Sequence, residues 1–360
     1  MLNCFSKDEL FFKFFFLFAM GFVVLGGVKV YFYSYENLEI YIRSLTQIPL
    51  KSFLSPSHFA FLKKISMGMC LFLGIMLIKL YGHTSSICRG MFVLKQDART
   101  FKDSFFSFVK NKIKSLTPIE RLIMGSFVFL GSYFMIQTAL LPLRSDEATV
   151  FVSFSSKPYW MIPCLYTNVG NHIFHTLLMK VSTDLFGTSL LAIRLPVLVA
   201  GILSLPLIFL VFSGLYTRTV GLGCMILTST SSAFILFSGN SRGYVIQIFL
   251  SLCFIGLSYF LRKNDNKTAW VLWVLSGILA FWTVPTAIYF HAGAWVWAFY
   301  IQIKYKNLEK IRPFIYSTLT MGLGILLLYI PPFVIAKGLA HMSVMMEGSN
   351  SFYLKKAICF

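Results

Sequence analysis

The chain has 360 residues, of which 57% are hydrophobic and only 12% are charged, and this composition excludes an ordinary soluble globular domain. The formal net charge of +19 does not indicate nucleic-acid binding, because the basic residues fall in short loops between apolar stretches. The composition therefore predicts an all-α integral membrane protein with the lipid bilayer, and no nucleic acid, as its surroundings.

Nine apolar stretches come close to the roughly 20 residues that a helix needs to cross a bilayer. The first is too long for the core of a signal peptide and predicts an uncleaved span. In chain order the stretches are 11–33, 65–81, 121–143, 189–213, 219–238, 243–261, the two arms of a hairpin from 268 to 303 that bends near Pro285, and 314–336. They predict a single polytopic domain with about nine transmembrane helices.

Lysine and arginine collect in the loops on one side of this topology. With the N-terminus inside, the inner segments hold 16 basic residues in 70 positions, whereas the outer segments hold 11 in 108. Because short cytoplasmic loops carry an excess of basic residues, this orientation is favoured. It divides the chain into N-terminal spans with a basic inner loop (1–120), a core (121–336) and an outer tail (337–360). The inner stretch 82–120 is expected to be amphipathic and to lie on anionic lipid.

The longest outer connection within the core, 144–188, is predicted to contain a surface-lying helix. Apolar residues recur at helical spacing from Ile173 onward, and Gly187 supplies a stop. Asn171, His172 and His175 lie near the start of this helix and are candidates for substrate binding. The alternative for the two histidines is hydrogen bonding within the loop. The i, i+3 spacing of the histidines leaves a metal site open as the less favoured alternative, because no third ligand is fixed by spacing.

Two adjacent acids open this loop in "RSDEATVF", and basic residues on the same outer side complement them. Asp146 and Glu147 are interpreted either as solvated loop charge or as a carboxylate that takes a proton from an acceptor. Arg194, inside the fourth span, needs a partner or snorkels to the headgroups. Together with Arg242 at the next outer turn it is a candidate site for a phosphate. Lys157 is interpreted either as a further phosphate ligand or as a solvated loop lysine.

Other catalytic signatures are absent from the sequence. There is no Walker-type phosphate loop, no GxSxG, no HExxH and no dinucleotide fingerprint, so no cofactor is expected. Without a nucleotide site, a sugar donor that is itself a lipid becomes the more plausible substrate.

The order of these motifs resembles that of a known family. The acidic pair is followed by "NHIFHTLL", "LFGTSLLAIRLPVLVAG" and "SGNSRGYVIQIFLSL". This order is similar to the multi-pass glycosyltransferases of the GT-C type, in the branch related to protein O-mannosyltransferases and lipid A aminoarabinose transferases. The similarity covers roughly residues 120–260.

The resemblance implies a function at the outer face of the membrane. It implies inverting transfer of a sugar from a polyprenyl-phosphate donor to a lipid, glycan or protein acceptor, with a bacterial inner membrane as the default location. Asp146 matches the acidic residue on the acceptor side, with Glu147 beside it. Arg194 in "RLP" and Arg242 in "SRGY" match positions associated with the donor phosphate, and Tyr244 belongs to the same turn and is expected to contact substrate.

Two alternatives remain at this point. A transporter or flippase for lipid-linked sugars would also contain intramembrane charge and broken helices, although repeats and midplane charges are not evident in the sequence. The second alternative is a truncated, inactive paralogue, because the family often continues through further spans beyond the point where this chain stops.

Overall fold

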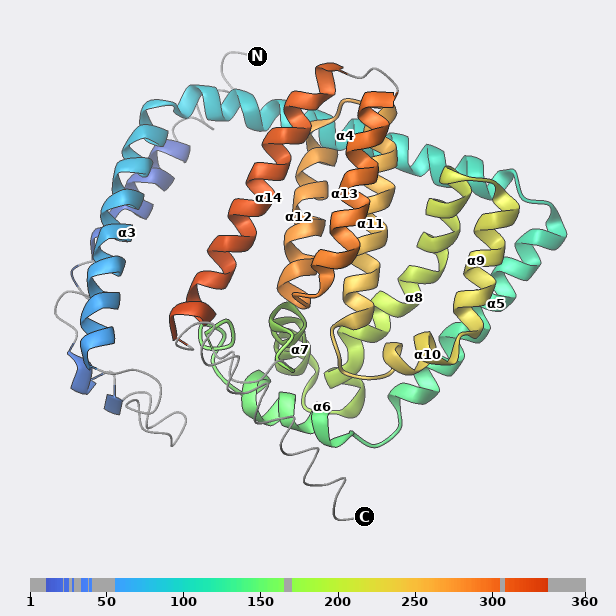
Figure 1. The fold of residues 1–360 in the computed structure, drawn as a ribbon, viewed down its shortest axis with the longest axis horizontal. Coiled ribbons are helices and arrows are strands. Elements are labelled where there is room, and N and C mark those ends of the chain that lie inside the picture. The colour runs from blue at the N-terminus through green and yellow to red at the C-terminus, as the bar shows by residue number, and fades with distance from the viewer. Residues whose placement is uncertain are drawn as a thin grey trace. The chain divides into compact units, whose positions relative to one another are not determined.

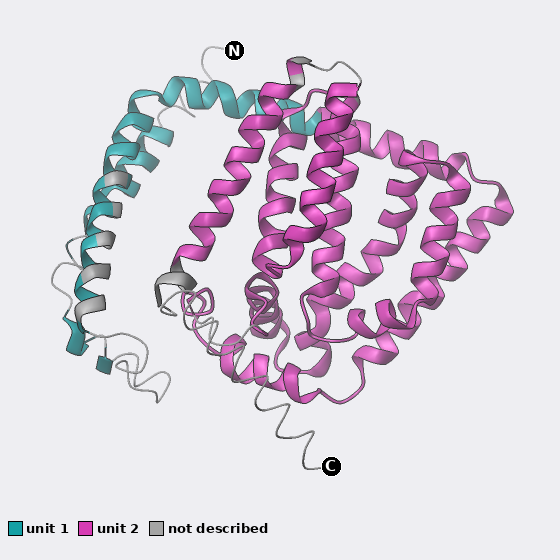
Figure 2. Cartoon of the chain, in the orientation of Figure 1, with its two compact units in different colours: residues 1–99 teal, residues 100–360 magenta. Residues whose placement is uncertain are grey.

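The computed structural model describes residues 11–21, 23–25, 28, 34–37, 39–40, 56–164, 170–304 and 308–335. Within these ranges the regular secondary structure is helical, which agrees with the all-α prediction. The predicted outer tail 337–360 lies outside the described residues. The chain divides into two compact units, residues 1–99 and 100–360 (Figure 2).

The first unit contains helix α3 (Pro56–Gly82) and the beginning of helix α4 (Thr84–Lys114). Helix α3 covers the predicted second span and begins nine residues before the predicted start at 65. Helix α4 occupies the stretch that was expected to be amphipathic, and it continues into the second unit. Its contact with lipid stays a prediction.

The second unit is a bundle of long helices with short elements at one end (Figure 1). Its elements are α5 (Pro118–Ala139), α6 (Ser145–Val150), the π-helix η2 (Phe151–Ser155), α7 (Ile173–Phe186), α8 (Leu190–Leu215), α9 (Arg218–Thr230), α10 (Ser232–Ser238), α11 (Tyr244–Lys263), α12 (Lys267–Thr283), α13 (Ala287–Lys304) and α14 (Leu308–Ile335).

Four helices among the described residues are long and apolar enough to cross a membrane: α5, α8, α11 and α14. A fifth span is added if α9 and α10, which meet at a bend of 66°, are counted as one broken span. The protein is therefore an all-α membrane protein. Nine spans are not shown, partly because α12 as a whole has only 17 residues and the first predicted span runs over residues outside the described ranges.

Helix ends in the bundle follow local sequence signals. Thr117 caps α5 through a capping box in which its hydroxyl accepts from the Glu120 N–H and the Glu120 carboxylate accepts from the Thr117 N–H. Ser231 ends α9 and caps α10, which places the bend at a serine. The predicted hairpin is confirmed, because α12 ends at Thr283 and α13 begins at Ala287, on either side of Pro285.

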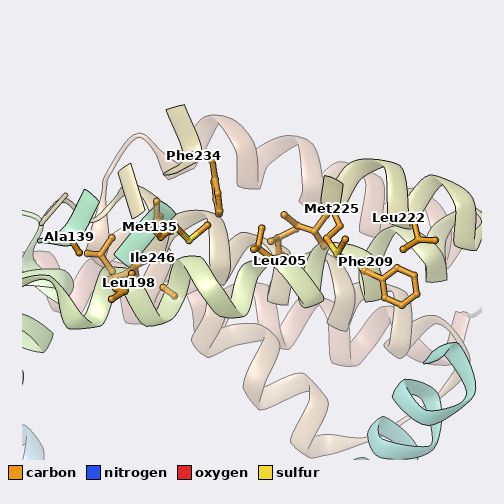
Figure 3. Packing of buried hydrophobic residues seen from close by; sticks show 14 of the residues in the cluster. Met135, Ala139, Leu198, Leu205, Phe209, Leu222, Met225, Phe234 and Ile246 are labelled. Carbon is orange, nitrogen blue, oxygen red and sulfur yellow. The ribbon is translucent and has the colours of Figure 1, made fainter. Parts of the chain in front are cut away.

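Helix α8 forms the centre of the main hydrophobic core. Figure 3 shows its Leu198, Leu205 and Phe209 in a row with buried side chains of neighbouring helices, among them Met135 of α5 and Met225 of α9. A second core joins α11, α12, α13 and α14 and is rich in aromatic rings. These two cores fix the ends of the helices that carry the polar residues described below.

Successive connections alternate between the two ends of the bundle (Figure 1). Helix α6, the start of α8, the 239–243 turn before α11 and the α12–α13 turn gather at one end. Helix α7 is drawn nearly end-on in Figure 1 and crosses this end of the bundle. The predicted helix in loop 144–188 is thus confirmed, and Gly187 ends it with a positive φ of 77°.

Candidate functional site

Polar side chains from four separate segments converge at this end of the bundle. Asp146 and Glu147 lie in the first turn of α6, and Arg194 lies in the second turn of α8. His175 lies in the first turn of α7, and Arg242 belongs to the turn that precedes α11. Residues separated by as many as 96 positions in the sequence are in direct contact here.

The first ion pair of the site joins Glu147 and Arg194. Arg194 Nε donates to Glu147 Oε1 at 2.9 Å, and Arg194 Nη2 donates to Glu147 Oε2 at 2.6 Å. The remaining guanidinium N–H groups donate to the carbonyl oxygens of Ala139, Leu141 and Pro142. A guanidinium has five N–H groups, so all of them are engaged within the protein.

The Glu147 carboxylate also receives hydrogen bonds from two backbone N–H groups. Oε1 accepts from the Ser241 N–H at 2.5 Å, and Oε2 accepts from the Arg144 N–H at 2.9 Å. The side chains of Glu147 and Arg194 are 0% and 2% exposed. Because breaking a buried pair leaves an uncompensated charge, this pair fastens α6 to α8 and to the turn that carries Ser241.

The second ion pair joins the neighbours of the first, Asp146 and Arg242. Arg242 Nε and Nη2 both donate to Asp146 Oδ2, at 3.0 and 2.5 Å, and Nη1 donates to the Gly170 carbonyl at 3.4 Å. Asp146 Oδ1 accepts from the Glu147 N–H at 3.0 Å. The Asp146 side chain is 43% exposed and that of Arg242 is 17% exposed, so this pair is accessible where the first pair is not.

Both acids are held in the charged form. Burial raises the pKa of Asp146, but the hydrogen bond and the charge of Arg242 outweigh this effect and leave the pKa below its usual value. Burial likewise raises the pKa of Glu147, but hydrogen bonds from Arg194, Arg144 and Ser241 outweigh this effect and leave the pKa below its usual value. At neutral pH the site therefore consists of two carboxylates neutralised by two guanidinium groups.

The two histidines join α7 to the 239–243 turn as neutral rings. His172 Nδ1 accepts from the Gly243 N–H at 2.7 Å, and His175 Nε2 lies 3.3 Å from the Ser241 Oγ. Burial, followed by the charge of Arg242, lowers the pKa of His172 to about 4. Burial, followed by the charges of His172 and Arg242, lowers that of His175 to about 3. These side chains position the turn that carries Arg242.

The other predicted site residues lie around this centre. Asn171 is buried, and its Oδ1 accepts from the Thr176 hydroxyl at 2.8 Å. Tyr244 begins α11, is 40% exposed and packs edge-on against the His172 ring at 4.9 Å. Lys157 follows η2, and no hydrogen bond or ion pair within the described residues connects its side chain to either acid–arginine pair.

Sequence reasoning missed the backbone groups that assemble the site. The Ser241 N–H, the Gly243 N–H and the three carbonyl groups bound by Arg194 carry no side-chain signature. One signal was present in the sequence, namely the glycine at position 243. A Cβ at this position would lie 2.5 Å from Thr283 Cγ2 and 2.8 Å from His172 Nδ1. The glycine of "SRGY" therefore permits the close approach of the turn to α7 and α12.

No group of three or more His, Cys, Asp or Glu side chains in the described ranges has an arrangement that could hold a metal ion. Comparisons with protein-family models, with curated proteins and with solved structures give no significant match to the chain. The case for a function therefore rests on the geometry of the site and on the resemblance of its motifs.

Proposed function

We propose that the protein is a membrane glycosyltransferase that moves a sugar from a polyprenyl-phosphate donor to an acceptor hydroxyl or phosphate. The single observation that carries the proposal is the accessible Asp146–Arg242 pair at one end of an apolar helical bundle. A carboxylate beside a guanidinium matches the charge flow of this reaction, because a proton leaves the acceptor while negative charge grows on the departing phosphate.

The roles divide between the two ion pairs according to exposure. The acceptor oxygen attacks the anomeric carbon, its proton passes to Asp146, and the bond between that carbon and the phosphate oxygen breaks with inversion. Arg242 holds the phosphate that leaves, because two of its N–H groups have no partner in the described part of the chain. Glu147 and Arg194 hold α6 and the 239–243 turn in place and do not contact the reactants.

The remaining candidates surround the acceptor and the donor. Tyr244 is exposed beside His172 and is proposed to pack against substrate, whereas Asn171, His172 and His175 support the turn. Lys157 is proposed to attract the anionic donor without direct contact to the reacting phosphate.

We also propose that the site faces outward from a bacterial inner membrane and that the chain crosses that membrane about nine times. Basic residues lie where helices that leave the site end reach the other end of the bundle: Arg262, Lys263 and Lys267 flank the α11–α12 connection, and Arg218 follows the α8–α9 connection. Basic loops favour the cytoplasmic side, so the site end is assigned to the outside.

A transporter is the less favoured function. The buried charged side chains in the described ranges, other than histidine, are Glu147 and Arg194, and they lie at the end of the bundle and neutralise one another. A transporter is expected to place ionisable groups near the midplane. No observation on the helices of the second unit favours that arrangement.

The test of the proposed function compares Asp146→Asn with Asp184→Asn. The two acids are matched in exposure, because the side chain of Asp146 is 43% exposed and that of Asp184 is 45% exposed. Each also forms an ion pair, Asp146 with Arg242 and Asp184 with Lys180. Purified protein is incubated with radiolabelled polyprenyl-phosphate sugars and a membrane lipid extract. We expect Asp146→Asn to lower transfer by about 100-fold or more, as for loss of a general base, and Asp184→Asn to retain it. Equal transfer by the two variants, or no transfer from any donor by folded wild-type protein, contradicts the proposal.

A further inference from the structure

The two ion pairs of the site differ in the geometry of their hydrogen bonds. Arg194 meets Glu147 with two parallel bonds, one to each carboxylate oxygen, which is the preferred bidentate arrangement. Arg242 instead places both of its bonds on one oxygen of Asp146, Oδ2. The second pair therefore lacks the geometry that makes an arginine–carboxylate pair most stable.

The pairs also differ in how much of their hydrogen-bonding capacity is used. Among the described residues Arg194 donates five hydrogen bonds, whereas Arg242 donates three, and one of these, to Gly170, is long at 3.4 Å. Both guanidinium groups have five N–H groups available. Arg242 thus has N–H groups without a partner among the described residues, and its side chain is 17% exposed.

The two ion pairs also differ in solvent exposure, and the Asp146–Arg242 pair is the more exposed one. The side chains of Glu147 and Arg194 are buried, but the Asp146 carboxylate is 43% exposed. An anion arriving at the site can therefore reach Arg242 and compete with Asp146 without dismantling the buried pair beside it. A phosphate is well suited to such competition, because it accepts bidentate hydrogen bonds from a guanidinium.

We propose that Arg242 is an exchangeable counter-ion, which pairs with Asp146 in the free protein and transfers its hydrogen bonds to the phosphate of a lipid-linked ligand when that ligand binds. The exchange leaves the Asp146 carboxylate without its guanidinium partner beside the acceptor. Asp146 then becomes an effective proton acceptor only when a donor occupies the site, so the donor binds before the acceptor is activated. This inference rests on the proposed function for the identity of the anion as the donor phosphate.

The exchange predicts that removing the charge of Asp146 strengthens phosphate binding, although the same substitution lowers transfer. The affinity of purified protein in detergent is measured for geranylgeranyl phosphate, for its uncharged alcohol geranylgeraniol and for inorganic phosphate. We expect Asp146→Asn to lower the Kd for geranylgeranyl phosphate about tenfold, which corresponds to about 1.4 kcal/mol. The Kd for geranylgeraniol is expected to stay unchanged.

Two further variants assign the effect to Arg242. Arg242→Gln is expected to raise the Kd for geranylgeranyl phosphate at least tenfold, and Asp146→Asn is expected to give no gain in that background. Asp184→Asn serves as the matched control and is expected to bind like wild type. If Asp146→Asn is not monodisperse, Asp146→Ser removes the same charge and takes its place.

Several results would overturn the exchange. An unchanged or higher Kd in Asp146→Asn means that the carboxylate does not compete with the anion. An equal gain in the Arg242→Gln background means that the gain does not come from Arg242, and an equal gain for inorganic phosphate rules out the lipid headgroup as the specific occupant. The proposed function fails separately: absent sugar transfer with the expected changes in Kd overturns the transferase but not the exchange, whereas transfer with an unchanged Kd overturns the exchange alone.

Discussion

His172 and His175 make the stability of the site sensitive to mild acid. In the folded protein burial holds their pKa values at about 4 and about 3. In the unfolded chain a histidine has a pKa of about 6.5, so below that pH the unfolded state binds protons that the folded state does not. The free energy of unfolding therefore decreases as the pH falls below that value, by up to about 1.4 kcal/mol per pH unit for each histidine.

This pH dependence is measured by thermal unfolding of the purified protein between pH 7.5 and pH 4.5. We expect the unfolding temperature of the wild type to fall as the pH passes below about 6.5. The unfolding temperature of His175→Gln is expected to fall less steeply with pH. The pKa values of Asp146 and Glu147 are also lowered, so the stability that their charges contribute is lost only from about pH 5 downward, as the unfolded carboxylates begin to bind protons. A slope in His175→Gln equal to that of wild type would show that the buried ring does not resist protonation.

The adjacent acids illustrate why single residues in a pattern do not reveal their roles. The sequence places Asp146 and Glu147 side by side, and neighbours on a helix point about 100° apart. In the structure one side chain turns inward to Arg194 and the other lies at the surface with Arg242. Only the tertiary position of α8 and of the 239–243 turn decides which acid is buried.

At the scale of helices, Gly221 sets how closely α9 packs on α8. A Cβ at Gly221 would lie 2.7 Å from the Phe209 carbonyl oxygen and 2.9 Å from the Ser213 N, whereas a Cβ at Gly223, two residues later, would meet nothing within 4 Å. Gly221→Ala is therefore expected to push the helices apart and to cost about 1–3 kcal/mol of stability. Gly223→Ala is expected to stabilise by about 0.5–1 kcal/mol, because alanine is the better helix former.

The pair of glycine variants is compared by thermal unfolding in one detergent and at one protein concentration. Opposite changes in unfolding temperature are expected from the same chemical substitution in the same helix. If both variants change stability in the same direction, the close approach of α8 and α9 at Gly221 is not a determinant of the fold.

Helices and turns could be predicted from the sequence to the extent that their signals are local. The stop at Gly187 and the break at Pro285 follow from backbone preferences of single residues, and the structure confirms both. The bend at Ser231 was not predicted, because the stretch 219–238 has the length of one span, and the five hydroxyl residues 228–232 that interrupt its apolar residues were counted as part of that span. Thr228 and Ser231 reveal no break by themselves, since serine and threonine are also tolerated inside apolar helices.

The site could be predicted as a set of residues but not as a set of pairs. The expected need of Arg194 for a partner is met by Glu147, at a separation of 47 positions that no local pattern encodes. The backbone carbonyls that complete its hydrogen bonding come from the last residue of α5 and from the connection that follows it, and any residue type supplies such an acceptor. Contacts of this kind depend on how the helices pack.

For the whole molecule, the orientation in the membrane is the prediction that links the fold to the function. The bundle has its acid–arginine site at one end and its basic loops at the other, so the site is expected to face outward. Ser156 follows η2, which comes directly after α6, and Asn264 lies between α11 and α12; both residues are exposed. Helix α6 and the α11–α12 connection lie at opposite ends of the bundle (Figure 1). Cysteines placed at these two positions, in a chain whose native cysteines are replaced, report the two sides.

Intact cells are treated with a membrane-impermeant maleimide before and after permeabilisation. Ser156→Cys is expected to react in intact cells, whereas Asn264→Cys is expected to react only after permeabilisation. The opposite pattern would place Asp146 on the cytoplasmic side and would exclude the outer-face reaction proposed here. Labelling of both positions in intact cells would mean that the helices between them do not carry the chain across the membrane an odd number of times, and the span assignment from α8 to α11 would have to change.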